Sequence, residues 1–238
     1  MRFLPAGDTA VIVEFSDRID RVVSDRVLRL SALVRAANLP GVVETVPTFR
    51  SLLVHYDPLA TESASVTVAI KNLLDSSRGE AKPVTLWRIP ACYAASHAPD
   101  LAEVAQRTGL SASDVIRLHS GTRYHVYMIG FVPGYPYMGD LPAPLSLPRR
   151  ADPRVRVPAG SIAIATTMTA IYPLESPGGW HLIGATPVRL FDARWQKPAL
   201  FGPGDAVQFE PIAPAEFDAI RAAVAADAYA VPSETIAV

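Results

Sequence analysis

The chain has 238 residues, a formal net charge of −1 and a hydrophobic content of 50%. This length suits one large or two small domains, and the apolar content is ample for their cores. The near-zero charge gives no electrostatic reason to expect nucleic acid or an anionic membrane as a partner. No apolar run is long enough to span a bilayer, and a single cysteine excludes an intramolecular disulfide. We therefore expect a cytoplasmic two-domain protein that binds a small ligand or another protein.

The first 85 residues predict a small α+β domain. Residues 9–15 alternate apolar side chains, which indicates a half-buried strand, and residues 17–38 show the 3.6-residue spacing of a helix. Strands at 42–46 and 52–56, a helix around 66–74 and a strand at 84–89 follow. This order is that of a ferredoxin-like sandwich, a split βαβ arrangement with helices on one face of an antiparallel sheet. The polar segment 76–83 then places a domain boundary between about 78 and 92.

Residues 86–238 predict a second domain of another kind. Two short helices at 100–108 and 114–118 have the look of a DNA-binding helix-turn-helix, but the acidic, small-residue start of the second helix does not suit a polyanion. Many short strands separated by Gly and Pro turns then indicate an antiparallel barrel or sandwich. These strands are expected at 124–129, 161–165, 170–172, 180–184, 189–192 and 206–210. A helix carrying Phe217, Ile220 and Val224 and a frayed tail end the chain.

Two segments rich in aromatic residues, glycine and proline stand out in this second domain. They are MIGFVPGYPYMGDL at 128–141 and SPGGWHLIGATP at 176–187. Proline fixes φ and glycine permits positive φ, so such segments form stiff loops of defined shape. A surface site and a rigid structural connector are equally compatible with this composition.

Candidate functional side chains surround these segments. His119 ends a predicted helix, where a helix C-terminus favours imidazolium, although such a histidine is most often a simple cap. Four arginines lie in LPRRADPRVRVP, and their guanidinium groups suit carboxylate or phosphate, unless they form a solvated rim or a protein interface. Tyr135 and Trp180 stand beside glycines and are candidates for the wall of an apolar pocket. No nucleotide-binding, hydrolase or zinc motif is present, so we expect no metal.

Several blocks of the sequence resemble a known family. The blocks include GVVETVPTFRSLLVHYDP, LHSGTRYHVYMIGFVPGYPYMGDL and IYPLESPGGWHLIGATP, and the likeness extends over essentially the whole chain. The chain resembles the B subunit of 5-oxoprolinase, a family also known as allophanate hydrolase subunit 1 or KipI-like proteins. The resemblance implies an N-terminal α/β domain followed by a cyclophilin-like β-barrel. It also implies a cytoplasmic complex with a homologue of the C subunit, an allophanate hydrolase subunit 2-like protein, and with a third subunit.

The resemblance further implies a reaction and a set of site residues. In the family reaction, 5-oxoproline, ATP and water become glutamate, ADP and phosphate, and no ATP site is identifiable in this chain. His119 is expected to assist proton transfer, and Arg149 or Arg154 to hold a carboxylate. The expected substrate-binding residues are Phe131, Pro133, Tyr135, Tyr172, Ser176, Gly178, Gly179 and Trp180.

The chain departs from the family pattern in one region. Thr166, Met168 and Ala170 stand where the family commonly has glycine, glutamine and glycine, and Ala185 stands where it often has arginine. The loss of an amide and a cation would alter the recognition of an anion or amide. Two other functions therefore stay open beside a part in 5-oxoprolinase. They are inhibition of a sensor histidine kinase and a part in hydrolysis of the allophanate or urea-amidolyase type.

Overall fold

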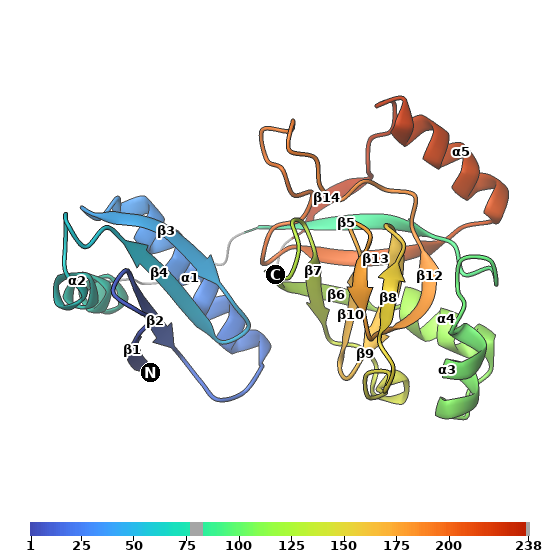
Figure 1. Ribbon diagram of the computed structural model, residues 1–238, viewed down its shortest axis with the longest axis horizontal. Helices are drawn as coiled ribbons and strands as arrows, with labels where there is room; N and C mark the ends of the chain where they lie inside the picture. The colour runs from blue at the N-terminus through green and yellow to red at the C-terminus, as the bar shows by residue number, and fades with distance from the viewer. Residues whose placement is uncertain (77–82, 237–238) are drawn as a thin grey trace. The chain divides into compact units, whose positions relative to one another are not determined.

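The computed structural model describes residues 1–76 and 83–236 and has a mixed α+β architecture (Figure 1). It divides into two compact units, Met1–Lys82 and Pro83–Val238. Most of the predicted polar boundary segment, 77–82, lies outside the described residues. Among those residues, no helix has both the length and the hydropathy needed to cross a membrane.

The first unit contains one antiparallel sheet and two helices. The strands run in the order β1 (Arg2–Pro5), β2 (Ala10–Glu14), β4 (Ser51–Tyr56) and β3 (Val42–Pro47). Helix α1 (Arg21–Ala37) begins where the Asp20 carboxylate accepts hydrogen bonds from two backbone N–H groups, and it ends at Asn38 in the left-handed region. Helix α2 (Ser63–Ser76) follows β4. Side chains of both helices, among them Leu30 and Ile70, pack with Leu52 of β4 in one apolar core.

The strand predicted to close this first unit belongs to the second unit instead. β5 (Val84–Ala91) pairs in parallel with β13 (Ala206–Pro211) and antiparallel with β14 (Ser233–Ile236). Its place beside β2 in the first sheet is taken by β1, whose four residues are too short for a period-two signal. The expected closing strand and the expected frayed tail were therefore wrong, because both segments find their partners across long sequence separations.

The second unit is built on an eight-stranded sheet. Its strand order is β12-β9-β10-β7-β6-β13-β5-β14. Cys92, just after β5, and Ala185, at the end of β12, form an isolated β-bridge in which each N–H donates to the other's carbonyl. Because β5 and β12 stand far apart in this strand order, the bridge closes the sheet into a barrel. The barrel is not purely antiparallel as predicted, since β5 and β13 run parallel. The strands not yet delimited are β6 (Arg123–Ile129), β7 (Pro136–Gly139), β9 (Ser161–Ala165), β10 (Met168–Ile171) and β12 (His181–Ala185).

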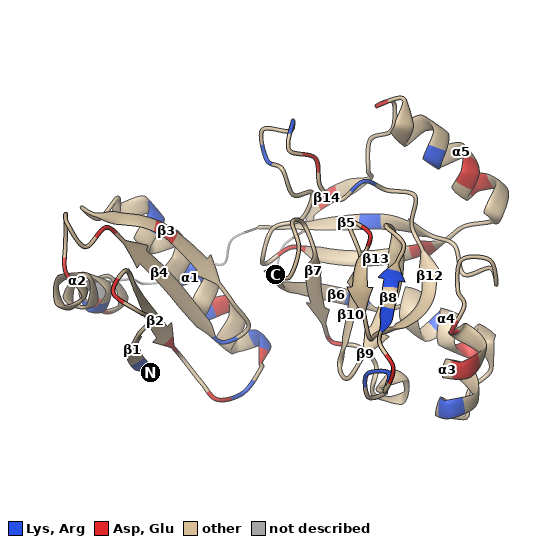
Figure 2. Ribbon diagram, in the orientation of Figure 1, with Lys and Arg blue, Asp and Glu red and all other residues tan. Residues whose placement is uncertain are grey.

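Shorter elements surround the barrel. Helices α3 (Leu101–Thr108) and α4 (Ala112–Ser120) pack against each other, and η1 (Ala143–Leu145) contacts both. A separate ribbon pairs β8 (Arg154–Val157) with β11 (Ser176–Gly178), and Figure 2 marks basic residues along β8 in blue. Helix α5 (Pro214–Ala225) precedes β14. The strand predicted at 189–192 is only an isolated bridge between Phe191 and Ala199.

Candidate functional site

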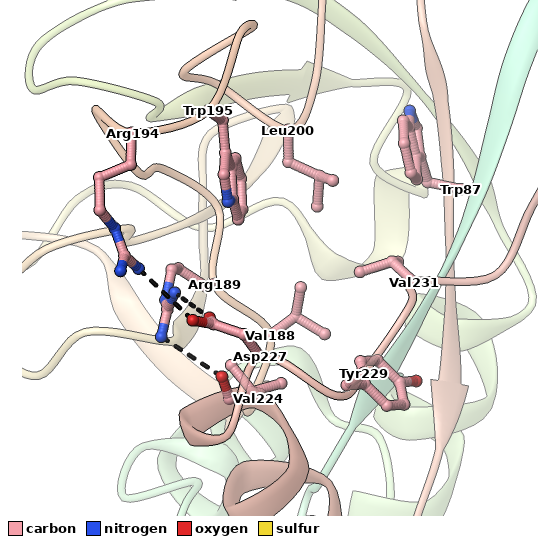
Figure 3. Close-up of a pocket in the computed structure, with 10 residues that line it drawn as sticks. All are labelled: Trp87, Val188, Arg189, Arg194, Trp195, Leu200, Val224, Asp227, Tyr229 and Val231. Atoms are coloured by element: carbon pink, nitrogen blue, oxygen red, sulfur yellow. Dashed lines mark hydrogen bonds and ion pairs between the residues drawn. The ribbon is translucent and has the colours of Figure 1, made fainter.

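A pocket of about 410 Å³ opens on the second unit, but none of the predicted site residues lines it (Figure 3). Trp87, Trp195 and Tyr229 contribute to its walls. The loop 128–141 and the segment 176–187, which were expected to form a barrel pocket, contribute nothing to it. The predicted site residues lie elsewhere on the unit.

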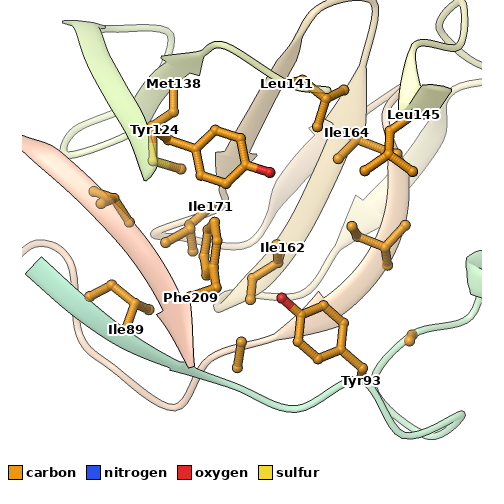
Figure 4. Packing of buried hydrophobic residues seen from close by; sticks show 14 of the residues in the cluster. Ile89, Tyr93, Tyr124, Met138, Leu141, Leu145, Ile162, Ile164, Ile171 and Phe209 are labelled. Carbon is orange, nitrogen blue, oxygen red and sulfur yellow. The ribbon is translucent and has the colours of Figure 1, made fainter. Parts of the chain in front are cut away.

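The interior of the barrel is filled by side chains. Tyr124, Met138, Ile162, Ile171 and Phe209 belong to one continuous cluster of buried apolar residues (Figure 4). Close packing of this kind leaves no room for a substrate. A substrate site on this unit must therefore use the outer face of the barrel or its rims.

His119 lies inside this packed interior. Its Nδ1 is 2.8 Å from the Tyr93 hydroxyl, and its Nε2 is 2.9 Å from the Thr169 hydroxyl. The Thr169 hydroxyl donates its own proton to the Ala163 carbonyl, 3.0 Å away, so it accepts from Nε2–H. Nδ1 is then the acceptor for the Tyr93 hydroxyl. Both ring nitrogens of a neutral imidazole are thus satisfied within the core.

The environment of His119 opposes the charged form. The ring is fully buried and stacks on Phe209 with a centroid distance of 4.6 Å. Burial without a compensating anion lowers the pKa of His119 from 6.5 to about 3. Desolvation outweighs the helix dipole here, so the shift in the pKa of His119 runs opposite to the one that a helix C-terminus favours. His119 has no exposed atom with which to meet a substrate.

The predicted aromatic residues do come together on the outside of the barrel. Tyr135 is the centre, with ring centroids 5.4 Å from Phe131, 5.1 Å from Tyr172 and 6.4 Å from Trp180. Tyr137, 4.9 Å from Tyr135, extends the group towards Trp180. We call these five residues the aromatic cluster. Burial raises the pKa of Tyr135, Tyr137 and Tyr172, so their phenols stay protonated and serve as neutral donors.

The loop that carries the cluster has an unusual backbone. Phe131 has φ of +72°, a region that a bulky residue rarely adopts, and its side chain is 59% exposed. Gly134 has φ of +78°, and a Cβ there would lie 2.8 Å from the Cβ of Phe191. Exposed Pro133 stands between them. Strained residues held by their surroundings concentrate at functional sites, so this loop favours a site over a connector.

The two predicted arginines have different surroundings. Arg149 is exposed, and its guanidinium carbon lies 5.9 Å from the centroid of the Trp180 ring. Arg154 instead donates to the Asp100 carboxylate at 2.6 Å, and Asp100 is only 4% exposed. The second Asp100 oxygen accepts from the backbone N–H of Leu182 at 2.7 Å, which ties the ribbon to β12. Arg154 is therefore part of the scaffold, whereas Arg149 has no acidic partner within residues 1–76 and 83–236.

The remaining predicted residues lie on the β8–β11 ribbon and just after it. A Cβ at Gly178 would collide with the Tyr172 hydroxyl, so only glycine lets the phenol approach the backbone. The Gly179 carbonyl accepts from the N–H of Arg150 at 2.8 Å. Ser176 is buried, and its hydroxyl has no hydrogen-bond partner among the described residues. It is available to a ligand or a water.

Two residues that matter to this arrangement were not selected from the sequence. Asp100 separates the roles of the arginines, but in the sequence it is only the first residue of a predicted helix. Val155, on β8, is 84% exposed, and no pattern distinguished it from a core valine. The available signal for Asp100 was an acidic residue at the start of a predicted helix, in a domain that also contains an arginine-rich segment.

The departures from the family pattern lie on β10 and β12, the two strands beside β9 in the barrel, or in the turn between β9 and β10. Thr166 has φ of +53° in the turn between β9 and β10, where a glycine is free of strain. Ala170 pairs with Tyr137 across β10 and β7. Ala185 forms the bridge to Cys92. The substituted positions therefore touch the strands that support the cluster.

Comparison with known proteins assigns the chain to a family. The model of the carboxyltransferase domain, subdomain C and D, matches residues 1–201. A protein named as the B subunit of 5-oxoprolinase from Escherichia coli O157:H7 is 38% identical over 205 residues, which cover 86% of this chain and 93% of that protein. The chain belongs to the family of 5-oxoprolinase B subunits. A protein of the same name from Bacillus subtilis (strain 168) is 36% identical, covering 90% of this chain and 94% of its own length.

A solved structure extends the likeness of the fold beyond this family. The crystal structure of the urea amidolyase of K. lactis matches with a TM-score of 0.81 at 19% identity. The match covers 99% of this chain and 16% of that much longer chain. At this identity the likeness shows the fold alone. The same two-unit fold thus occurs as a small part of a larger protein.

Proposed function

We propose that this protein is the B subunit of a cytoplasmic 5-oxoprolinase, an ATP-dependent hydrolase that opens the lactam 5-oxoproline to glutamate. The observation that carries the proposal is the 38% identity to a 5-oxoprolinase B subunit over nearly the whole of both chains. In the reaction one water adds across the lactam C–N bond, and a second accounts for the hydrolysis of ATP to ADP and phosphate. A homologue of the C subunit and a third subunit complete the complex, and ATP binds within that assembly.

We place the substrate against the aromatic cluster. Exposed Phe131 and half-buried Tyr137 are the rings of the cluster that a five-membered ring can reach, because Tyr135 and Trp180 are buried behind them. The exposed guanidinium of Arg149 suits the carboxylate of the substrate. The Ser176 hydroxyl, buried and unpartnered among the described residues, is placed to hydrogen-bond a polar group of the ligand. Arg154 contributes by fixing the ribbon through Asp100. His119 is given no proton-transfer role here, because it is neutral and enclosed.

The finer description of the fold belongs to the same proposal. The first unit has the strand and helix arrangement of a ferredoxin-like sandwich in which β1 replaces the last strand. The second unit is a closed barrel with a packed interior, which suits the cyclophilin-like description. We take 1–82 and 83–238 as the domains, three residues earlier than the boundary expected from the sequence.

The test uses the assembled complex. The chain is co-purified with a homologue of the C subunit and the third subunit, and ATP hydrolysis is measured with 5-oxoproline and with 2-pyrrolidinone, the same lactam without its carboxylate. We expect 5-oxoproline to stimulate hydrolysis and 2-pyrrolidinone to do so far more weakly. If the assembled complex hydrolyses ATP at the same rate with and without 5-oxoproline, the proposal is overturned.

A sequence likeness to a urea amidolyase, over 90% of this chain, supports a second candidate function. In that case the complex would act on allophanate or another carboxylated amide, and the same assay with allophanate in place of the lactam would show it. A third candidate, inhibition of a sensor histidine kinase, predicts tight binding to a purified kinase dimerisation domain. Stimulation by 5-oxoproline together with no binding to the kinase excludes both alternatives.

A further inference from the structure

The pocket of about 410 Å³ is separate from the aromatic cluster and unused by the proposed function (Figure 3). It lies over Trp87 of β5, between the segment 188–200 and the segment 224–231 that links α5 to β14. Its size is within the roughly 300 to 1,000 Å³ of small-molecule sites. None of its lining residues belongs to the cluster.

The walls of this pocket are mainly aromatic and aliphatic. Trp87, Trp195 and Tyr229 supply the rings, and Leu200 and Val231 the aliphatic surface. The Trp87 indole is held in place because its Nε1 donates to an Asp205 carboxylate oxygen at 2.9 Å. An edge-on contact with the Phe201 ring at 5.9 Å supports the same indole from behind. The pocket therefore presents a fixed aromatic wall, which suits another ring.

The charged end of the pocket is already neutralised from within. Nη1 of Arg189 donates to Asp192 at 2.9 Å and to Asp227 at 2.8 Å. Arg194 donates to Asp192 through Nε at 2.9 Å and through Nη2 at 2.6 Å. Two arginines thus face two carboxylates, and the hydrogen bonds of Arg194 hold the pKa of Asp192 far below its usual range. A charged ligand would have to displace one of these partners.

One wall of the pocket lies outside the segment that the carboxyltransferase-domain model matches. The family model matches residues 1–201, whereas Val224, Asp227, Tyr229 and Val231 come later in the chain. The pocket also shares no lining residue with the aromatic cluster, against which we place the substrate. Binding here is expected to add to the proposed activity rather than to form part of it.

We propose that this pocket binds a small, uncharged aromatic molecule. The ring stacks against the indoles of Trp87 and Trp195, and the closed set of ion pairs at the other end selects against anions and cations. A nucleotide is disfavoured for the same reason, because its phosphates would have to replace Asp227 beside Arg189. The proposal holds whether or not the complex acts on 5-oxoproline.

The binding test uses the full chain labelled with 5-fluorotryptophan and three matched probes. The probes are 1-naphthalenemethanol, which is neutral, 1-naphthoate, which is anionic, and 1-naphthylmethylammonium, which is cationic. The chain has three tryptophans, so Trp87, Trp180 and Trp195 each give one fluorine resonance that a Trp-to-Phe variant assigns. Trp180, in the aromatic cluster, reports binding elsewhere.

We expect the neutral probe to shift the resonances of Trp87 and Trp195 saturably, and each charged probe to bind about tenfold more weakly, since displacing one charged partner costs on the order of 1.4 kcal/mol or more. Val231→Phe, which fills the pocket, should abolish these shifts. Val155→Phe makes the same change at an exposed site on β8 and should leave them intact. Dispersed fluorine resonances confirm that each variant is folded.

A second variant tests the charge argument without filling the pocket. Asp227→Asn leaves two arginines facing one carboxylate, and asparagine tolerates the φ of +53° found there. We expect the affinity for 1-naphthoate to rise about tenfold with little change for the neutral probe, because a freed guanidinium gains a charged partner. Asp218→Asn on α5 is the matched control. Equal affinity for all three probes, or shifts that survive Val231→Phe, would overturn the proposal.

Discussion

In two regions of the same barrel, polar groups lie against aromatic rings. The regions differ in whether those polar groups already have hydrogen-bonding or ionic partners within the protein. Inside, both ring nitrogens of His119 have partners in Tyr93 and Thr169. Outside, Arg149 lies over Trp180 with no acidic partner among the described residues, and Phe131 is exposed on a strained backbone. Groups whose hydrogen bonds are satisfied within the protein build its fold, and those left over are available for function.

The largest expected effect on stability comes from a substitution in the barrel interior. His119→Ala removes the partner of two buried hydroxyls and opens a cavity, so the free energy of unfolding should fall by about 4 kcal/mol. Urea unfolding followed by tryptophan fluorescence measures it, since all three tryptophans lie in the second unit. His55→Ala, in the first unit, should leave that transition in place. A loss below about 1 kcal/mol would show that the network is not structural.

The next effect compares two arginines on one strand. Arg154→Met leaves the buried Asp100 carboxylate with the backbone N–H of Leu182 and, as a cationic partner, only Arg150 at the longer distance of 3.4 Å. We expect a loss of about 2 kcal/mol in the free energy of unfolding. Arg156→Met breaks an exposed pair with Glu175 and should leave the free energy of unfolding nearly unchanged. Equal effects of the two variants would remove the distinction between a scaffold arginine and a surface arginine.

The pH dependence of stability offers a third comparison. The pKa of His119 is about 3 in the folded chain and near 6.5 when unfolded, so between these values the unfolded state binds more protons. The free energy of unfolding should therefore fall on acidification from pH 6.5 to 3, with a contribution of about 1.4 kcal/mol per pH unit from this group. His119→Gln should lack that contribution. If the free energy of unfolding depends on pH in the same way for both proteins, the pKa of His119 is not lowered by folding.

The smallest expected effect on stability concerns the turn before β10. The side chain of Thr169 on that strand points into the barrel, and that of Ala170 points out of it. Thr166→Gly relieves the positive φ of a β-branched residue and should stabilise the second unit by up to about 1 kcal/mol. Thr167→Gly next to it relieves no such strain and should destabilise. Thermal unfolding of both variants checks the sign. Destabilisation by Thr166→Gly would show that the hydrogen bond from its hydroxyl to the Ala165 carbonyl outweighs the strain.

The sequence predicted what depends on neighbouring residues. The helical spacing of α1 and the turn-forming loop 128–141 are local signals, and both appear in the structure. Strand partnership is not local, which is why β5 was placed in the wrong sheet and β14 was missed. Short edge strands such as β1 carry too few residues for their period to show.

The same limit applied to the candidate site. Arg149 and Arg154 stand in one arginine-rich segment and are indistinguishable there, and only Asp100, some fifty residues earlier, separates them in space. His119 was interpreted as a helix cap because its burial depends on Tyr93 and Thr169, which lie far from it in the sequence. Most of the aromatic cluster was predictable because glycine and proline beside aromatic residues mark four of its five members within two short segments, and Tyr172 lies just before the second.

The most direct test of the central claim is the value of kcat/KM for 5-oxoproline-dependent ATP hydrolysis by the assembled complex carrying Arg149→Met. If the aromatic cluster holds the substrate, loss of this guanidinium should lower kcat/KM about a hundredfold, or roughly 3 kcal/mol, with the urea midpoint of the isolated chain unchanged. A folded, assembled Arg149→Met complex with the kcat/KM of the unaltered protein would contradict the claim.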